Sequence, residues 1–412
     1  MEKKIIHKAY KFRAYPNKEQ EIFIKKSCGS CRFVYNHFLA EKTRYYVLHK
    51  NDKKKGLTFL ETEHLLTKLK KQEEYIWLNE INSQSLQYAL RNLDSAYTRF
   101  FNKIGSFPKF KKKTNGGSFT IPQFFKIVEE GDKWLYLKIP KLDQPLKIRK
   151  SQEIKGKILY ITISMTPTGK YFASFTCKEE MEFKQNKKEK VAGLDVGIKE
   201  FVFTSDNEII QNDKNIKKKE RRRKIKQRKL AKSKKGGNNR KKLCKQLAVK
   251  YEKEANVRKN FLHQTSNYIV KNQDIIIAEN LNVKGMIKNH KLAKALSHQS
   301  FGEFFRQLEY KSDWNNKIFH RIDRWFPSSK LCSNCGAIKE NLKLSDRLYK
   351  CDCGLEIDRD YNASINIKNL GLSDLNISTV GTTESYASGR VKITDISKIM
   401  SVNSNEGRIP CL

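Results

Sequence analysis

Four cysteines near the carboxyl end restrict the fold of this chain more than any other residues. Cys332 and Cys335 form a C-x-x-C pair, Cys351 and Cys353 form a C-x-C pair, and 15 residues separate the two pairs. A glycine directly follows each pair and lets the backbone turn beneath a metal. Four thiolates at this spacing can close a tetrahedron around one structural Zn²⁺. Because sulfur would fill every coordination position, a catalytic metal must bind elsewhere.

The other cysteines do not extend this zinc site. Cys28 and Cys31 also form a C-x-x-C pair, but the residues around them have helical spacing and no second Cys or His pair lies nearby. Four of the cysteines cluster within 332–353, in a long chain that lacks a secretory signal. Such clustering favours metal binding over disulfides. We therefore expect Cys28 and Cys31 to be ordinary buried thiols.

Acidic residues interrupt two segments that otherwise read as buried strands. Asp195 lies within the apolar segment 191–198, and Glu279 ends the apolar segment 275–279. An ionised carboxylate in such a strand is costly unless a cation compensates it. A third acid, Asp360, directly precedes a segment with helical spacing, and Asp358 stands two residues before it. This pair supplies a third acidic group beside the first two acids.

Carboxylates from two neighbouring strands and one helix start indicate a site for hard divalent cations. Mg²⁺ prefers oxygen ligands, and two such ions can promote hydrolysis of a phosphodiester bond. No G-x-S-x-G or H-E-x-x-H motif offers a competing chemistry. The predicted reaction is hydrolysis of a DNA backbone.

The charge of the chain predicts a polyanionic partner. Lys and Arg number 84 against 44 acidic residues, a formal charge of +40. Residues 214–245 carry 18 of these basic residues and one acid, Glu220. So one-sided a run repels itself unless phosphates neutralise it. The basic side chains that we expect to contact nucleic acid are Arg221, Arg222, Arg223, Lys224 and Arg228.

A membrane partner is disfavoured by the same sequence. No apolar run approaches the roughly 20 residues of a spanning helix, and the amino terminus lacks the apolar region of a signal peptide. We expect a cytoplasmic, prokaryote-like protein.

Alternation and helical spacing predict an α/β chain of several domains. Residues 3–16 read as a strand, residues 17–105 as helical, and residues 106–185 as β-structure with a hairpin at 158–178. The clearest helical stripe comprises Leu86, Leu90 and Leu93 with the aromatic residues that follow. A polar linker at 184–190 precedes the second domain, and residues 371–412 have the composition of a disordered tail.

Several segments, in order, resemble the TnpB family of insertion-sequence nucleases, which are relatives of type V CRISPR effectors. The segments are GLDVGIKEF (193–201), RKNFLHQTSNYIV (258–270), IIIAENLNVKGM (275–286), WFPSSKLCSNCG (325–336) and DRDYNASINI (358–367). Near the amino terminus, KAYKFRAYPNKEQ (8–20), CRFVYNHFLAEK (31–42) and FPKFKKK (107–113) look like the same family. The resemblance covers nearly the whole chain up to about residue 370.

This resemblance implies a RuvC, RNase H-like nuclease domain (190–330 and 354–370) interrupted by a zinc ribbon (331–353) that binds target nucleic acid. It also implies a β-barrel wedge domain (1–16 and 106–185) with a helical recognition insertion (17–105). The family pattern places its catalytic acids at Asp195, Glu279 and Asp360. We expect Asp358 to be a bystander, because Asp360 directly precedes the expected start of the helix.

Proteins of this kind use a transposon-encoded guide RNA and a short transposon-adjacent motif to cut double-stranded DNA. The guide RNA recognises the target strand by base pairing. A protein of this type therefore binds its RNA through the shape of the RNA and through its phosphate groups. The resemblance places the motif-reading surface on the helix that carries Asn82, Gln84 and Gln87. We expect a monomer bound to one RNA.

Three other functions remain as alternatives. A guide-dependent repressor that no longer cuts would not need all three acids, which are present. A DDE transposase would order its acids Asp, Asp, Glu, whereas this chain has Asp, Glu, Asp. A zinc-ribbon accessory protein without chemistry would leave Asp195 and Glu279 as unexplained buried charges.

Overall fold

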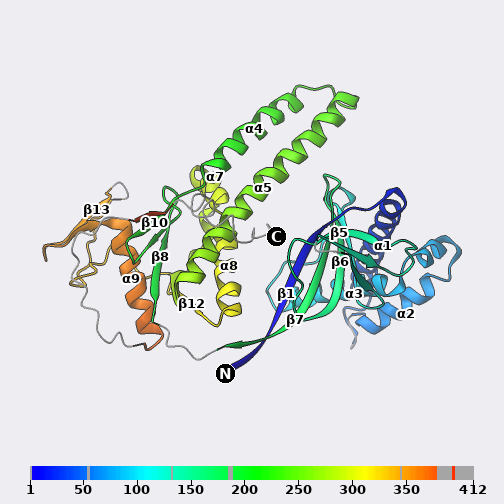
Figure 1. The fold of residues 1–412 in the computed structure, drawn as a ribbon, viewed down its shortest axis with the longest axis horizontal. Helices are drawn as coiled ribbons and strands as arrows, with labels where there is room; N and C mark the ends of the chain where they lie inside the picture. Colours follow the sequence, from blue (N-terminus) through cyan, green and yellow to red (C-terminus); the bar gives the residue numbers. More distant parts are fainter. Residues whose placement is uncertain are drawn as a thin grey trace. The chain divides into compact units, whose positions relative to one another are not determined.

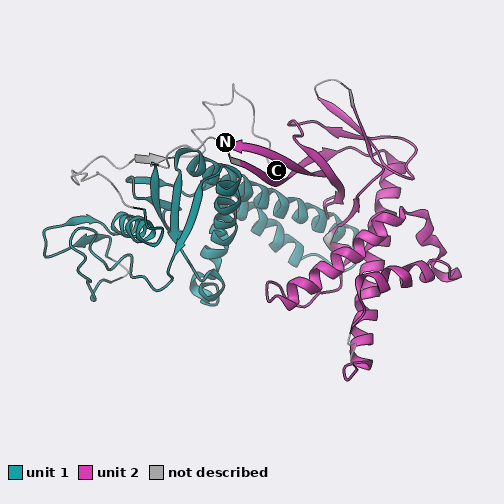
Figure 2. Ribbon diagram, turned by 90° about the horizontal axis from the view of Figure 1, so that it is seen from below, with its two compact units in different colours: residues 1, 183–411 teal, residues 2–182, 412 magenta. Residues whose placement is uncertain are grey.

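The computed structural model describes residues 2–52, 56–130, 133–183, 189–343, 346–377 and 392–394. The chain divides into two compact units, residues 2–182 and 183–411 (Figure 2). The boundary adjoins the segment 184–190, where the sequence predicts a linker; residues 184–188 lie outside the described residues. Within the described residues, no helix is both long and apolar enough to cross a bilayer.

The amino-terminal unit contains a seven-stranded sheet in the order β2-β6-β7-β1-β5-β4-β3. Its strands are β1 (Glu2–Ala14), β2 (Gly117–Ile121), β3 (Lys126–Glu130), β4 (Trp134–Lys138), β5 (Leu146–Arg149), β6 (Lys157–Met165) and β7 (Tyr171–Phe183). The predicted hairpin is β6 and β7, which pair antiparallel. Strands β2 and β3 end this order and do not pair with each other among the described residues. The closed barrel therefore stays a prediction.

Helices are inserted between β1 and β2 of this sheet. They are α1 (Lys18–Leu48), α2 (Phe59–Leu69), η1 (Glu73–Glu80), α3 (Ser83–Phe101) and η2 (Lys113–Asn115). Helix α1 begins at a capping box in which Asn17 and Gln20 exchange side-chain to backbone hydrogen bonds of 2.8 and 3.0 Å. The leucines of the predicted stripe on α3, Leu86, Leu90 and Leu93, are buried in one hydrophobic core with residues of α1 and the sheet, whereas Tyr97 and Phe100 are only partly buried.

The carboxyl-terminal unit contains a six-stranded sheet in the order β12-β11-β8-β9-β10-β15. Its strands are β8 (Val191–Val196), β9 (Val202–Thr204), β10 (Glu208–Ile210), β11 (Ile275–Glu279), β12 (Ile318–Ile322) and β15 (Lys392–Thr394). Strands β8, β9 and β10 form an antiparallel meander, whereas β11 runs parallel to both β8 and β12. This mixed sheet supports the α/β class that the sequence predicts.

Helices cover both faces of this sheet (Figure 1). On one face, α5 (Asn238–Asn272) and α8 (Phe301–Trp314) bury an aromatic core that includes Phe201, Phe261 and Phe304. On the other face, α9 (Arg359–Asp374) buries Ile367 against Ile277. The remaining helices are α4 (Lys214–Ala231), α6 (Val283–Met286) and α7 (His290–Gln299). The unit thus has two hydrophobic cores, one on each face of the sheet.

Helix α9 approaches the sheet closely because a glycine lies at each of two contact points. Gly193 of β8 faces α9, and Gly371 of α9 faces β11. A Cβ atom on Gly193 of β8 would lie 2.1 Å from the backbone oxygen of Ser364, and one on Gly371 of α9 would lie 2.3 Å from a methyl carbon of Ile277. Side chains at these positions would force α9 away from β8 and β11. The glycines therefore fix the distance between α9 and both acid-bearing strands.

The carboxyl-terminal segment is only partly described. The sequence predicts that order ends near residue 370, but α9 continues to Asp374 and residues 392–394 pair parallel with β10 as β15. These two pieces correct that expectation, since each has a partner in the sheet. The rest of the predicted tail, 378–391 and 395–412, lies outside the described residues.

Candidate functional site

Two of the predicted acids stand at the same end of adjacent strands. In the parallel register of β8 and β11, Leu194 is opposite Ala278, so the next residues, Asp195 and Glu279, are neighbours. Side chains two residues apart on a strand point to the same face. Asp195 thus shares the face of Gly193, and Glu279 shares that of Ile277, both of which contact α9. Both acids project to the α9 side of the sheet.

The third acid lies in the first turn of α9. The helix begins at Arg359, so Asp360 is its second residue and does not precede it as the sequence predicted. The reason is the cap: Asp358 Oδ1 accepts hydrogen bonds from the backbone N–H groups of Asp360 at 2.9 Å and Tyr361 at 3.2 Å. Asp358 therefore has a structural role that keeps the direction of Asp360 fixed.

The charges of Glu279 and Asp360 both act on the carboxyl group of Asp195. Burial, then the charge of Glu279 and then that of Asp360 raise the pKa of Asp195 well above its usual value. Burial also raises the pKa of Glu279, and burial together with Asp358 raises that of Asp360. Three acids from separate parts of the chain thus form one electrostatic group.

Two contacts hold individual carboxylates of this group. Ser328 Oγ donates a hydrogen bond of 2.5 Å to Glu279 Oε1, which lowers the pKa of Glu279 against the effect of burial. Arg347 lies 3.5 Å from Asp360 Oδ2, and the Asp360 side chain is 33% exposed. The group is thus partly open to solvent at Asp360.

The donor set fits a hard divalent cation. Carboxylate oxygens are the ligands that Mg²⁺ prefers, and an added positive charge would relieve the repulsion that raises the pKa of Asp195. Asp195, Glu279 and Asp360 are the residues that could hold such ions. A site of this type could promote attack on a phosphodiester.

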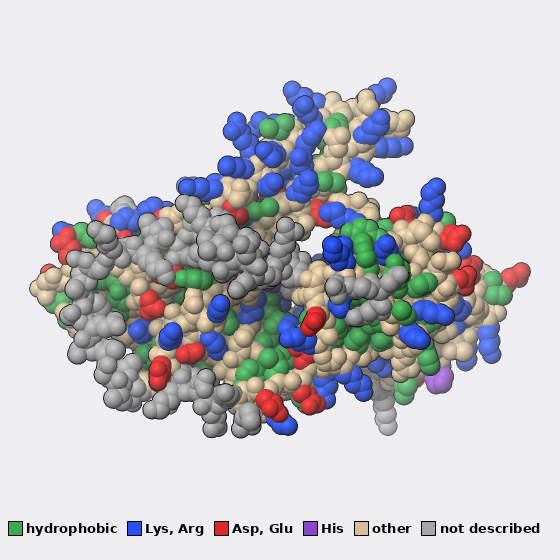
Figure 3. Space-filling model, in the orientation of Figure 1, with side chains coloured by type: hydrophobic (Ala, Val, Ile, Leu, Met, Phe, Trp, Pro, Cys, Tyr) green, Lys and Arg blue, Asp and Glu red, His purple; other side chains and the backbone are tan. Residues whose placement is uncertain are grey.

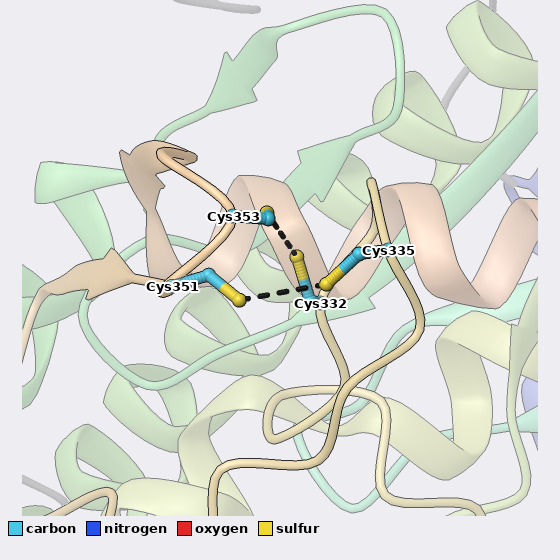
Figure 4. A group of neighbouring side chains, drawn as sticks. All are labelled: Cys332, Cys335, Cys351 and Cys353. Atoms are coloured by element: carbon cyan, nitrogen blue, oxygen red, sulfur yellow. Dashed lines mark hydrogen bonds between the residues drawn. The ribbon is translucent and has the colours of Figure 1, made fainter.

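The four cysteines form a second, tighter group (Figure 4). The sulfur atoms of Cys332 and Cys353 are 3.7 Å apart, and those of Cys335 and Cys351 are 3.6 Å apart. In a tetrahedron with Zn–S bonds near 2.3 Å, sulfur atoms are separated by about 3.8 Å. Among the described residues, these four are the only His, Cys, Asp or Glu group of three or more with all ligand atoms within 4.8 Å. The geometry suits one tetrahedral metal.

The backbone of each cysteine pair turns as its glycine predicts. Gly336 and Gly354 have φ angles of +73° and +89°, which other residues rarely adopt. Strands β13 (Leu348–Lys350) and β14 (Glu356–Asp358) pair antiparallel, and the second cysteine pair lies in the turn between them. By contrast, Cys28 and Cys31 are buried in α1, and burial raises the pKa of each to about 12.

Three polar residues of this region are absent from the sequence prediction. Asn362 and Asn366 are buried one turn apart on α9, and both donate to the backbone oxygen of Leu331 at 2.7 Å. Ser328, which binds Glu279, belongs to the same segment as Leu331. The available signal was a pair of asparagines at helical spacing in the otherwise apolar segment 362–367. Such residues are costly to bury unless they are hydrogen-bonded.

The basic run 214–245 forms α4, a turn and the start of α5, and Lys and Arg side chains cover the visible face of this hairpin (Figure 3). Arg221, Arg222 and Arg228 are exposed. Lys224 lies 3.0 Å from Glu220 within the helix. Arg223 differs, because its side chain is 14% exposed and its Nε donates to Glu254 at 2.6 Å. Arg223 therefore fastens α4 to α5.

The predicted motif-reading residues surround the start of α3. Asn82 caps the helix by accepting a hydrogen bond of 3.1 Å from the Gln84 backbone N–H. The Gln84 side chain donates to Gln123 at 3.3 Å, and Gln87 is exposed. Of the three, Gln87 is the side chain most open to a partner.

Three family profiles match separate parts of the chain. Residues 174–290 match the IS605 OrfB profile described as "Probable transposase", and residues 301–367 match "Cas12f1-like, TNB domain". Residues 1–51 match a profile described as "Helix-turn-helix domain". In the structure, that segment is the strand β1 followed by the single long helix α1.

Similar proteins cover most of the chain. A Streptomyces pristinaespiralis protein named "Putative RNA-guided DNA endonuclease" is 33% identical over 89% of this chain and 90% of its own length. The InsQ protein of Escherichia coli K12, with the same description, is 27% identical over 87% of this chain and 91% of its own.

A solved structure shares the fold. A chain from a structure titled "Cryo-EM structure of the Cas12f1-sgRNA-target DNA complex" superposes with a TM-score of 0.54 at 14% identity, covering 89% of this chain and 99% of that chain. This likeness concerns the fold alone. The profile matches and the near full-length similarity show that the chain belongs to the TnpB family of IS605-type insertion-sequence proteins.

Proposed function

We propose that this protein is an RNA-guided DNA endonuclease that hydrolyses phosphodiester bonds at Asp195, Glu279 and Asp360. The observation that supports it most is the parallel register of β8 and β11, which makes Asp195 and Glu279 neighbours at one edge of the sheet, where the charges of Glu279 and Asp360 both act on Asp195. Relatives of nearly the same length are named as RNA-guided DNA endonucleases. The proposal includes action in the cytoplasm as a monomer on one RNA.

The three carboxylates would hold a pair of Mg²⁺ ions. When bound, the ions supply positive charge to the attacking and leaving oxygens of the phosphodiester. Among the described residues, the three carboxylates do not form a group as tight as the four thiols. Two-metal sites of this chemistry hold their ions about 3.5–4 Å apart.

The four cysteines would hold one structural Zn²⁺. Their sulfur separations match a closed tetrahedron, so the ion has no position open to substrate. Its proposed role is to keep the ribbon that follows β12 in shape. The carboxylates, and not the cysteines, would then carry out the hydrolysis.

The exposed basic side chains of the hairpin, Arg221, Arg222 and Arg228, would contact nucleic-acid phosphates together with Lys224. Guide RNA would supply sequence recognition by base pairing. We assign reading of the short DNA motif to the start of α3, with Gln87 in direct contact and Asn82 and Gln84 positioning the helix.

The test is to purify the protein from cells that carry its transposon end and sequence the RNA that copurifies. We expect one dominant RNA, and with it Mg²⁺-dependent cleavage of DNA that matches its guide segment. Heterogeneous RNA without guide-dependent cleavage would contradict the proposal. Guide-dependent binding without cleavage would instead support the repressor alternative.

A further inference from the structure

We propose that Ser328 is a positioning residue for Glu279, and that the zinc ribbon holds Ser328 in place through Asn366 and Asn362 of α9. The inference rests on the proposed function, since it concerns how the same carboxylate is kept ready for a divalent ion. A series of hydrogen bonds leads from the backbone on either side of Cys332 to the carboxylate of Glu279. All of its members belong to the carboxyl-terminal unit.

The first link is the contact between Ser328 and Glu279. Ser328 is 7% exposed, and its hydroxyl has one proton, which it donates to Glu279 Oε1 at 2.5 Å. Glu279 is the last residue of β11, where the sheet no longer fixes the direction of a long side chain. With Oε1 held by Ser328, rotation of the carboxylate is restricted and Oε2 is left for a metal. A ligand oriented in advance binds its ion with a smaller loss of side-chain entropy.

The second link holds Ser328 itself. Asn366, which is 3% exposed, donates from one Nδ2 to the backbone oxygens of Ser328 at 2.8 Å and Leu331 at 2.7 Å. These bonds fix the backbone on both sides of the turn that carries Ser328. An unpaired amide at this depth would be costly, so Asn366 has a strong reason to keep both acceptors.

The third link reaches the cysteines. Asn362 is fully buried; its Nδ2 donates to Leu331 at 2.7 Å, and its Oδ1 accepts from the Ser333 backbone N–H at 3.0 Å. Cys332 lies between those two residues and is itself 1% exposed. Metal binding at Cys332 and the asparagine contacts therefore order the same few residues of backbone.

Because α9 also carries Asp360 in its first turn, one helix positions two of the three acids. Asp360 is fixed directly, and Glu279 is fixed through Ser328. Ordering of the ribbon by zinc should then favour binding of a divalent cation at the carboxylates, and the reverse must hold by thermodynamic linkage. The ribbon would be a support for the nuclease site as well as a surface for nucleic acid.

The experiment measures Mn²⁺ binding by electron paramagnetic resonance on the full chain, which gives a readout independent of cleavage. We expect Ser328→Ala to weaken Mn²⁺ binding about 10–100-fold, the usual loss when a partner of a metal ligand is removed. Ser328→Thr keeps the hydroxyl and should restore most of the affinity. Ser329→Ala, at the adjacent half-buried serine, is the matched control and should bind as the parent does.

Zinc content separates positioning from misfolding. Ser328→Ala should retain about one zinc per chain, while removal of zinc from the parent should weaken Mn²⁺ binding and have much less further effect in Ser328→Ala. Equal Mn²⁺ affinity in Ser328→Ala and Ser329→Ala would overturn the inference and leave the proposed function standing. If the parent itself shows no Mn²⁺ binding that Glu279→Gln removes, the proposed metal site fails, and the positioning role fails with it.

Discussion

The thiol group and the carboxylate group of this protein are built in opposite ways. The four thiols come from residues 332–353, and their sulfur atoms already lie at separations that suit a metal. The carboxylates come from Asp195, Glu279 and Asp360, on two strands and a helix. Burial raises the pKa of all three, and the charges of Glu279 and Asp360 raise that of Asp195 further. A local motif forms a closed site with little help, whereas the nonlocal site exists only where the whole sheet and α9 have formed.

The difference matters for what each site can do. A tetrahedron of sulfur leaves no ligand position for substrate, so the cysteine group can only support structure. The carboxylate group keeps the cost of its unneutralised charge, and that cost is what a divalent ion would relieve. In this protein, the group that carries an uncompensated charge cost is therefore the one suited to catalysis.

The largest effect should follow from breaking the thiol group. Cys332→Ser or Cys351→Ser should reduce zinc from about one per chain to nearly none, because metal binding by such a group contributes about 10–16 kcal/mol at neutral pH. Elemental analysis gives the zinc content, and limited proteolysis should then cut within 331–358. Cys244→Ser, at an exposed thiol of α5, is the control and should keep its zinc. Native protein without zinc would contradict the assignment.

The next largest effect concerns the carboxylates. Asp195→Asn or Asp360→Asn should reduce the cleavage rate about 10⁴-fold or more, the scale seen when a central catalytic group is removed, while guide and target binding persist. Asp358→Asn is the matched control, because asparagine also caps helices and should keep the bonds to Asp360 and Tyr361. Guide-dependent cleavage assays measure the rate. A parent-like rate for either site variant would contradict the assignment.

The sequence predicts both groups but not their support. Apolar runs with a single acid identified Asp195 and Glu279, because an unpaired charge in a strand needs an explanation. The same reasoning could not find Ser328 or Asn366, since their partners are backbone oxygens and a carboxylate that only the folded chain brings near. It also placed Asp360 before the helix, because spacing reveals the apolar stripe but not the cap at Asp358.

In the basic hairpin too, the sequence does not show which arginines contact other protein groups. Arg221, Arg222 and Arg223 are consecutive and equivalent in composition, but their positions on α4 differ. Arg223 faces α5, where it binds Glu254 and lies over the Tyr251 ring at 4.7 Å. Only the register of two helices separates the arginine that stabilises the hairpin from those open to phosphate.

A smaller effect should separate these arginines. Arg223→Gln should lower the free energy of unfolding by about 1.5–3 kcal/mol, the range for hydrogen bonds to charged groups; Arg258, 3.3 Å from Glu254, limits the loss. Arg222→Gln should change stability by less than about 0.5 kcal/mol. It should instead reduce the salt dependence of RNA binding by about one phosphate contact. Denaturant unfolding and binding titrations at several salt concentrations measure the two effects. Equal stability of the two variants would contradict the distinction.

The smallest expected effect tests the cost of charge in the carboxylate group. A carboxyl group whose pKa is raised by folding loses its proton at lower pH in the unfolded chain, so the metal-free protein should lose stability as the pH rises above about 4. Asp195→Asn removes that charge. Without divalent ions at pH 7, the variant should therefore melt higher than the parent, by about 2–4 °C for each kcal/mol of relief.

The same variant should reverse its rank when metal is added. Mg²⁺ stabilises only a chain that binds it, so the parent should gain in melting temperature while Asp195→Asn gains little. At pH 4 without metal the two should melt together, because the carboxyl group is then protonated in the folded state. Asp206→Asn, at an exposed acid in the turn between β9 and β10, controls for a general change of charge. A variant that melts lower than the parent at pH 7 without metal would mean that other groups of the protein already compensate the charge of Asp195, and the cost assigned to the carboxylate group would be contradicted.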